Sequence, residues 1–446
     1  MKPAALLAGV LFWTVMTSGA GTTRAEETRP KGGEFTLSAD MSVSAYYASS
    51  FNSYFGDGVQ SGDDAGKLDH SWFEAVAHPS LRFACDCGAG GGHWHGEVSA
   101  VATTRENHVG GWSPKNDRLS HELAYVGWAS GNMFEGLGED ALQVSAGNQR
   151  FSIGDGFLVH DGGSDSALGT PYWLAPHRAF KESVVIRMEV APIRMTAFRL
   201  VRRGGPGADT RFAGVDLNVV DDALGVLGVS VFHISDDENQ DNRDGMEVIS
   251  VRGQGHPFAE TGLPSVFLSG EYVRQTNDDT AVRQEAQAWY LEAGYELPDL
   301  VWSPYAGYRY SSFSGDDPAT AETNEGYDPL FYGFGRGWGS WFQGELIGGY
   351  DINTNMGVHM ARLEVRPADN LTVSFLYFDF DLDQPQGAAS AGSYAREFDV
   401  YVDWSPIESL AVSAFWGIAA PDNGAARIYG HDDNATIAGV YASYSF

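Results

Sequence analysis

The sequence has few basic side chains, no long apolar run after its start, and no linker or fixed repeat. Lys and Arg number 28 against 59 Asp and Glu, and the formal net charge of −31 argues against a nucleic-acid partner and favours cations or neutral partners. Beyond the first 25 residues no stretch approaches the roughly 20 consecutive apolar residues that a membrane-spanning helix needs. Without linkers or repeats, 446 residues fit one large closed sheet better than several soluble domains.

The start of the chain has the pattern of a secretory signal peptide. The basic Lys2 precedes an apolar run over 4–16, and small residues that follow offer cleavage sites. We therefore expect a signal peptide over 1–25 and a single domain over 26–446 that is exported in a Gram-negative bacterium. An exported chain that stays in a membrane without spanning helices must satisfy its backbone hydrogen bonds as a β-barrel.

The end of the chain, 436–446, is one alternating strand that finishes on Phe446. This pattern is typical of the closing strand of an outer-membrane β-barrel, and it resembles the signal that the barrel-assembly machinery reads, in which the terminal Phe is the key residue. The alternative is an edge strand of a soluble β-protein. One face of the strand carries small and apolar residues with one aromatic: Ala438, Val440, Ala442 and Tyr444.

Segments of alternating polarity recur along the chain, and 34–47 is the cleanest of them. At about 3.3 Å per residue, ten or so such residues tilted by about 45° cross a bilayer. We count about eighteen segments, among them 141–153, 210–221, 300–313 and 371–382. The sequence therefore predicts an all-β fold, a transmembrane antiparallel β-barrel of the outer membrane with about 18 strands and both termini on the periplasmic side.

The connections between these segments alternate between short and long. Short turns of such barrels lie in the periplasm and long loops lie outside, so the long connections at 154–179 and 314–353 are expected outside. Acidic residues also gather in external connections such as 236–244. Their oxygens would bind divalent cations and bridge to lipopolysaccharide phosphates. The alternative is that these acids are solvated loop tips.

The lumen face follows from the apolar rows on the opposite face of each strand. On 393–405 the apolar row from Phe398 to Trp404 faces lipid, and the intervening residues face inward. Charges on the lipid face would cost about 2–4 kcal/mol at the midplane, so inward placement is the safer inference. The lumen is therefore expected to be polar and of mixed charge. Its predicted pore residues are Arg187, Glu189, Arg309, Glu397, Asp399 and Asp403.

The two longest connections, 154–179 and 314–353, are too aromatic for purely solvated loops. The second includes Arg336, Trp338 and Trp341 among its glycines. Aromatic faces stack on the C–H faces of sugar rings, and charged groups hydrogen-bond sugar hydroxyls or carboxylates. Both loops would thus line a carbohydrate path. The alternative is that they plug the mouth or pack on the barrel wall.

Two short segments resemble recurrent elements of a known family. Residues 147–151 (GNQRF), within 142–157, and residues 327–331 (YDPLF) look like elements of the alginate-export porin family. The resemblance implies an eighteen-stranded barrel that passes an anionic polysaccharide across the outer membrane. By position, it also implies that Arg150 is a pore-side arginine.

One constellation suggests a metal site, in which Cys85 and Cys87 are followed by His93 and His95. Four such side chains on one face would suit zinc or copper. Matching the apolar rows of the two strands instead places the cysteines and the histidines on opposite faces. We therefore expect no metal and no cofactor. A disulfide between Cys85 and Cys87 is allowed in the oxidising periplasm but would be strained, so free thiols at the periplasmic rim are the default expectation.

No motif singles out a catalytic nucleophile, so we expect that the chain is not an enzyme. The function that the pattern favours is a porin-like outer-membrane channel for small polar solutes or a polysaccharide. The alternative is a surface barrel that binds or assembles polysaccharide without an open pore. Expected neighbours are outer-membrane lipid and lipopolysaccharide.

Overall fold

A computed structural model gives the fold of this chain. It describes residues 35–60, 65–86, 92–106, 118–163, 171, 173–204, 208–238, 243–280, 282–333, 343–350, 353–385 and 392–446. The predicted signal peptide lies outside these residues. Within the described ranges, no helix is both long enough and apolar enough to cross a membrane.

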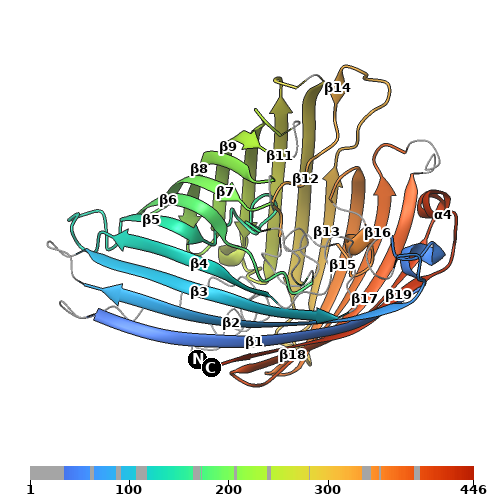
Figure 1. Ribbon diagram of the computed structural model, residues 1–446, viewed down its shortest axis with the longest axis horizontal. Coiled ribbons are helices and arrows are strands. Elements are labelled where there is room, and N and C mark those ends of the chain that lie inside the picture. The colour runs from blue at the N-terminus through green and yellow to red at the C-terminus, as the bar shows by residue number, and fades with distance from the viewer. Residues whose placement is uncertain are drawn as a thin grey trace.

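Eighteen long antiparallel strands form one closed barrel wall (Figure 1). Each strand pairs with its neighbours in the chain, and β1 closes the wall against β19. The prediction of an all-β barrel with about 18 strands is confirmed. The strands are β1 (Phe35–Phe51), β2 (His70–Cys85), β3 (His93–Glu106), β4 (Arg118–Ala129), β5 (Leu142–Gln149), β6 (Phe180–Val190), β7 (Ile193–Arg202), β8 (Thr210–Asp221), β9 (Gly225–Asp237), β10 (Glu247–Gly255), β11 (Val266–Asn277), β12 (Arg283–Glu296), β13 (Tyr305–Phe313), β15 (Met356–Ala368), β16 (Leu371–Leu382), β17 (Ser393–Ile407), β18 (Leu410–Pro421) and β19 (Ala435–Ser445).

Short elements lie in the connections between these strands. The two-residue strand β14 pairs in parallel with β12 and adds no member to the barrel wall. The one-turn helix α3 follows in the same connection. The described short elements are η1 (Ser53–Gly56), η2 (Ala259–Thr261), β14 (Thr323–Asn324), α3 (Ile347–Tyr350) and α4 (Asn423–Tyr429).

The predicted closing strand occupies the seam of the barrel. Met41 and Phe446 exchange two backbone hydrogen bonds, each with an N–O distance of 3.0 Å. Phe446 is 63% exposed as a residue, and its ring lies beside that of Tyr444, with 5.3 Å between ring centroids. The terminal residue thus completes the wall and presents its ring outward, as a lipid-facing position requires.

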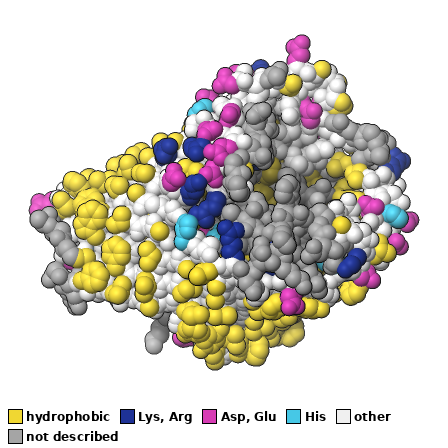
Figure 2. Space-filling view, in the orientation of Figure 1, with side chains coloured by type: hydrophobic (Ala, Val, Ile, Leu, Met, Phe, Trp, Pro, Cys, Tyr) yellow, Lys and Arg dark blue, Asp and Glu magenta, His cyan; other side chains and the backbone are white. Residues whose placement is uncertain are grey.

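The strands carry apolar side chains outward and buried side chains inward. On β1, Phe35 and Leu37 are 60% and 65% exposed, whereas Tyr46 and Ala48 are 1% and 0% exposed. Figure 2 shows hydrophobic side chains spread over large parts of the outer wall. An apolar outer band around a polar interior is the arrangement that a barrel in lipid requires.

β5 is shorter than the alternation predicts, because it ends at Gln149 rather than near residue 153. Beyond this point the chain turns into the barrel. The N–H of Ile153 donates to the carbonyl of Val159 at 3.0 Å, and Phe151 packs on Phe198 of β7 with ring centroids 4.9 Å apart. The apolar residues after Gln149 therefore build an interior core and not a lipid-facing row.

β13 starts at Tyr305, later than the predicted 300. The preceding residues form a turn in which the N–H of Leu297 donates to the carbonyl of Pro304 at 2.9 Å. Apolar side chains at this turn are exposed, and Val301 is 80% exposed. Residues 300–304 have the apolar composition of a strand, but their backbone forms a turn at one end of the barrel. The predicted start of this strand was therefore too early.

Candidate functional site

Two long connections fold into the barrel and fill part of its interior. The first inserted segment comprises residues 150–163 and 173–179 between β5 and β6. The second inserted segment comprises residues 327–333 and 343–350 between β13 and β15. Both carry buried aromatic and aliphatic side chains that pack on the inner face of the strands. This packing is what the alternative of loops on the barrel wall describes, and a carbohydrate path along them stays a prediction.

The two inserted segments pair with each other inside the barrel. The N–H of His160 donates to the carbonyl of Phe331 at 2.7 Å, and the N–H of Phe331 donates to the carbonyl of Leu158 at 3.1 Å. A parallel β-bridge joins Val159 to Phe331. Because backbone hydrogen bonds connect them, the two segments form one cross-braced body.

Three buried glutamates of the barrel wall hold this body by the same contact. Each carboxylate accepts two consecutive backbone N–H groups at 2.7–3.1 Å, and each glutamate is 1% exposed. Hydrogen bonds to a charged acceptor contribute about 1.5–3 kcal/mol each. We call these contacts the glutamate clamps. They join Glu74 of β2 to Trp173 and Leu174, Glu122 of β4 to Arg178 and Ala179, and Glu397 of β17 to Leu346 and Ile347.

The YDPLF segment is an anchor of the second inserted segment. Asp328 accepts two hydrogen bonds from Arg243, at 2.6 and 2.7 Å. The guanidinium groups of Arg202 and Arg243 are 5.4 and 5.6 Å from the ring centroid of Phe331, and this ring stacks on Phe212 at 4.8 Å. Cation–π contacts of desolvated groups are worth about 2 kcal/mol. The YDPLF segment therefore fixes the second inserted segment to the barrel wall.

Arg150 lies directly after β5 and belongs to a group of cations and histidines on one side of the interior. Its Nε atom is 4.0 Å from Glu122 Oε1. Burial lowers the pKa of Arg150, and the Glu122 charge opposes this effect. The pKa of His160 falls to about 3 because of burial and the nearby Arg178 and Arg150, so that its ring is neutral at pH 7. Figure 2 shows Lys, Arg and His side chains gathered near the middle of one face of the molecule.

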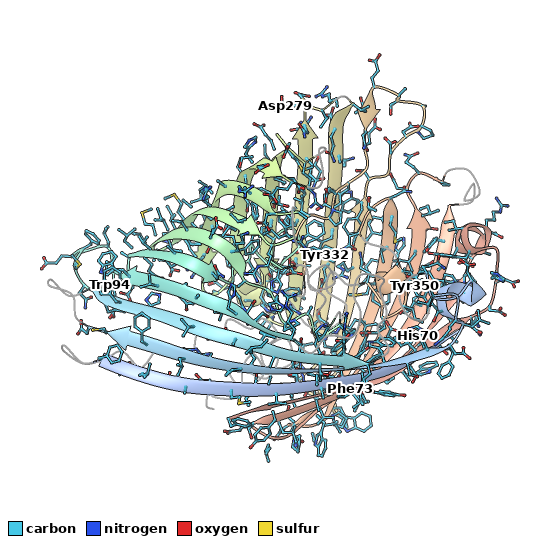
Figure 3. All side chains as sticks on the ribbon, in the orientation of Figure 1. His70, Phe73, Trp94, Asp279, Tyr332 and Tyr350 are labelled. Atoms are coloured by element: carbon cyan, nitrogen blue, oxygen red, sulfur yellow. The ribbon has the colours of Figure 1, made fainter. Side chains whose placement is uncertain are left out.

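Carboxylates gather where the second inserted segment meets β17. Tyr401 donates to Glu345 Oε1 at 3.2 Å and approaches Asp399 Oδ2 at 3.4 Å. Trp173 of the first inserted segment donates from Nε1 to Glu345 Oε2 at 3.4 Å. Figure 3 shows Tyr350, which ends α3, on the side of the barrel where η1 and α4 lie, and its ring stacks on Tyr54 at 4.1 Å. The interior thus has a cation-rich side and an acid-rich side.

The predicted pore residues that the structure describes lie on the inner face of their strands, and their role in transport stays a prediction. Arg309 is 1% exposed and faces Glu292 in the strand register. Arg187 lies on the same face of β6 as Glu189, which forms an ion pair with Arg194 at 3.1 Å.

The structure brings only some of these residues together. Glu397 and Asp399 lie beside Glu345, whereas Asp403 accepts a hydrogen bond from Ser413 at 2.7 Å. Arg187 and Arg309 lie on strands well apart from them in the wall. The predicted loop residues Arg336, Trp338 and Trp341 lie outside the described residues.

Sequence reasoning missed most of the glutamates that hold the two inserted segments. Glu74, Glu122 and Glu345 were not among the predicted site residues. The inward position of Glu74 could have been predicted, because it alternates with Trp72 and Val76 on the buried face of β2. The partners of these acids are backbone N–H groups of distant loops, and no sequence pattern identifies those.

The suspected metal site does not assemble from the described residues. The register pairs Cys85 with Trp94 and Ala84 with His95, so that Cys85 and the two histidines face opposite sides of the wall. Cys85 is disulfide-bonded, which corrects the expectation of a free thiol. Cys87 is the other cysteine of the sequence and lies outside the described residues. Within those residues, no group of three or more His, Cys, Asp or Glu side chains has metal-binding geometry.

The barrel and its inserted segments agree with a comparison against known families. The family described as Alginate export matches residues 114–395, which is more than half of the chain. The chain belongs to the alginate export family. The resemblance of the GNQRF and YDPLF segments is therefore confirmed. No curated protein matches the sequence.

Solved structures with a similar fold include three proteins of Pseudomonas aeruginosa, of which OpdK is described as an outer membrane protein. OpdK shares 11% identity with this member of the alginate export family, with a TM-score of 0.56, over 92% of this chain and 98% of that chain. OccK9 (OpdG) shares 12% identity with this chain, with a TM-score of 0.56, over 92% of this chain and 98% of that chain. OccK2 (OpdF), solved in complex with glucuronate, shares 11% identity with a TM-score of 0.55, over 92% of this chain and 96% of that chain. At such low identity the likeness shows the fold alone.

Proposed function

We propose that this protein is a porin-like channel of the outer membrane that passes small polar solutes or a polysaccharide. Membership of the alginate export family and the fold of outer-membrane channels support this function. The observation that carries it is a closed wall, apolar outside and charged inside, whose interior holds a cross-braced body on glutamate clamps. Two inserted segments that narrow the lumen would provide a structural basis for selective passage.

We further propose that solutes with a carboxylate group contact the cation-rich side of the interior. Arg150 and Arg178 lie there beside histidines that are neutral hydrogen-bonding groups, such as His160. Guanidinium groups match carboxylates in geometry and charge. A sugar acid such as glucuronate, which OccK2 holds, has this chemistry. The hydroxyls of such a solute can reach polar side chains on the opposite wall.

A barrel without an open pore is the second candidate function. The packing of both inserted segments against the wall favours it, because buried aromatic rings occupy part of the interior. In that case the outer face of the protein would bind or assemble polysaccharide. A conductance measurement separates the two candidates.

The test is single-channel recording of the refolded protein in a planar bilayer under a salt gradient. We expect steady steps with a reversal potential that shows ion preference. A heat-modifiable, folded barrel that stays silent would overturn the channel and favour surface binding. Liposome swelling with glucuronate and with glucose then reports the solute class.

Arg150→Gln is expected to weaken anion preference. The substitution removes a charge from the cation-rich side of the interior and keeps a polar side chain of similar length. The reversal potential should move toward cation preference and swelling with glucuronate should slow by several-fold. Arg396→Gln is the matched control, because Arg396 is half exposed and pairs with Asp422 outside the lumen. Equal reversal potentials for both variants would contradict a role for Arg150.

Removal of Phe446 is expected to impair assembly of the barrel. The deletion abolishes both backbone hydrogen bonds to Met41 at the seam and the outward ring. Far less protein, by several-fold, should reach the outer membrane in heat-modifiable form. Phe446→Tyr keeps the aromatic terminus and should assemble normally. Normal assembly of the truncated chain would show that the seam tolerates the loss.

We also propose that residues 1–25 are the signal peptide and that lipopolysaccharide surrounds the outer rim. Divalent cations at the acidic loops are a weaker proposal, because arginines already pair with the described acids there. Arg211 pairs with Asp236 and Glu238, and Arg243 lies 3.6 Å from Asp237. These contacts leave fewer carboxylates for a cation.

A further inference from the structure

Three buried carboxylates meet where the second inserted segment docks on β17. Glu345, Glu397 and Asp399 are 7%, 1% and 0% exposed. In the part of the chain that the structure describes, no lysine or arginine forms an ion pair with any of the three. Carboxylates that share a buried site cannot all ionise, because each charge raises the cost of the next.

Glu345 connects this site to both inserted segments. It belongs to the second segment and accepts hydrogen bonds from Trp173 of the first segment and from Tyr401 of the wall, at 3.4 and 3.2 Å. The indole of Trp173 stacks on Tyr46 with centroids 4.0 Å apart and planes 14° apart. A change at Glu345 therefore affects the contact between the plug and the wall on this side.

The groups around Glu345 are acidic or phenolic on every described element packed against it. On β1, Tyr46 interacts with Glu345, and Tyr350 at the end of α3 interacts with the neighbouring Glu397. On β2, Glu74 is paired in register with Arg105 of β3 and holds the first inserted segment. From β17, the side chains that face Glu345 are Glu397, Asp399 and Tyr401.

The pKa of Glu345 is raised from an ordinary value of 4.5 to about 7. Burial is the largest cause, and the charge of Glu397 adds to it. Hydrogen bonds from Trp173 and Tyr401 lower the pKa but do not cancel this rise. A released Glu345 would titrate near its ordinary value, so the docked segment binds the extra proton between pH 4.5 and 7. Docking is therefore strongest below pH 4.5, weakens as the pH rises through this window, and reaches its minimum above pH 7. The docking constant falls on the order of a hundredfold over this range.

We propose that Glu345 and Asp399, beside the ionised Glu397 of the glutamate clamp, form a proton-dependent latch. It holds the second inserted segment against β17 when Glu345 and Asp399 carry protons, and releases the segment when they ionise and repel Glu397. Release opens the junction with Trp173 and widens the path through the barrel. The latch rests on the proposed channel function and describes its regulation. Acid conditions favour the narrow state and alkaline conditions favour the wide state.

Hydrogen–deuterium exchange of the refolded protein tests the latch without reference to conductance. The amides of Leu346 and Ile347 donate to Glu397, so they report directly on docking. After correction for intrinsic exchange rates, their protection should fall at least tenfold from pH 5.5 to pH 8.5. Single-channel conductance should rise over the same range. Equal protection at both pH values would overturn the latch, whatever the conductance does.

Glu345→Gln identifies the group that titrates. The amide still accepts a hydrogen bond but cannot ionise, so protection and conductance should lose most of their pH dependence and stay in the narrow state at pH 8.5. Glu364→Gln makes the same chemical change on β15, where Glu364 is 1% exposed and pairs with Arg362 and Arg366. It should keep the wild-type pH dependence. If amide protection and conductance of Glu345→Gln depend on pH as they do in the wild type, Glu345 is not the group that titrates.

Failure of the channel and failure of the latch give different results. Protein that never conducts but shows pH-dependent protection of residues 343–350 overturns the channel and keeps the latch. Protein that conducts equally at both pH values with constant protection keeps the channel and overturns the latch. Should Glu345→Gln not fold, Trp173→Phe removes the indole N–H donor and should weaken protection of the same amides at pH 5.5.

Discussion

Arg243→Leu is expected to release the second inserted segment from the barrel wall. Arg243 makes two hydrogen bonds to Asp328, lies 3.6 Å from Asp237 and faces the ring of Phe331. Leucine fills part of the volume but leaves these buried acids without their cation. Loss of one partner from a buried ion pair costs about 3–5 kcal/mol. The measurement is limited proteolysis and amide exchange over residues 327–333, which should become at least a hundredfold less protected.

The control for this variant is Arg274→Leu. Arg274 lies on β11 and pairs with Glu285, but both side chains are more than a third exposed. Exposed pairs contribute about 0–1 kcal/mol, so protection of the second inserted segment should not change. If Arg243→Leu also leaves that protection unchanged, the YDPLF anchor is not what holds the segment.

Glu122→Ala is expected to free the end of the first inserted segment and to raise conductance several-fold. The carboxylate accepts the N–H groups of Arg178 and Ala179 at 2.7 and 2.8 Å and lies near Arg150. Alanine leaves both buried N–H groups without their acceptor and Arg150 without the neighbouring charge, at a cost of about 3–5 kcal/mol. Single-channel recording and amide exchange at residues 178 and 179 give the result.

Two further variants make the Glu122 experiment specific. Glu122→Gln retains one acceptor oxygen and should give intermediate protection. Glu285→Ala removes an exposed glutamate on the outer face of β12 and should leave the conductance unchanged. Wild-type conductance with normal amide protection in Glu122→Ala would mean that neighbouring contacts hold the segment without this clamp.

The barrel wall is predictable from the sequence because lipid and lumen impose opposite polarity on alternate residues. The bounds predicted for β8 and β16, 210–221 and 371–382, agree with the structure to the residue. The errors fall where apolar residues serve another purpose. Residues 150–153 are apolar in part because they enter the interior, and residues 300–304 because they form an exposed apolar turn.

The interior of the barrel is less predictable, because its contacts join distant parts of the chain. Alternation correctly places Glu397 and Asp399 on the inner face. It gives no information on which loop lies against them, and Glu397 meets Ile347 across 50 residues of sequence. Glu74 meets Leu174 across 100 residues. Such pairings depend on the path of a loop through space, for which a single sequence carries no periodic signal.

The glutamate clamps also set an order of events in folding. Glu74 and Glu397 stand near opposite ends of the chain, on β2 and β17, and these strands become neighbours of one interior only when β1 has paired with β19. Contacts of such high sequence separation form late. The contact of Trp173 with Glu345, which joins the two inserted segments across 172 residues of sequence, is therefore expected to form after each clamp has docked its own segment. Newly inserted molecules would pass through a short, leaky stage before they reach the selective state.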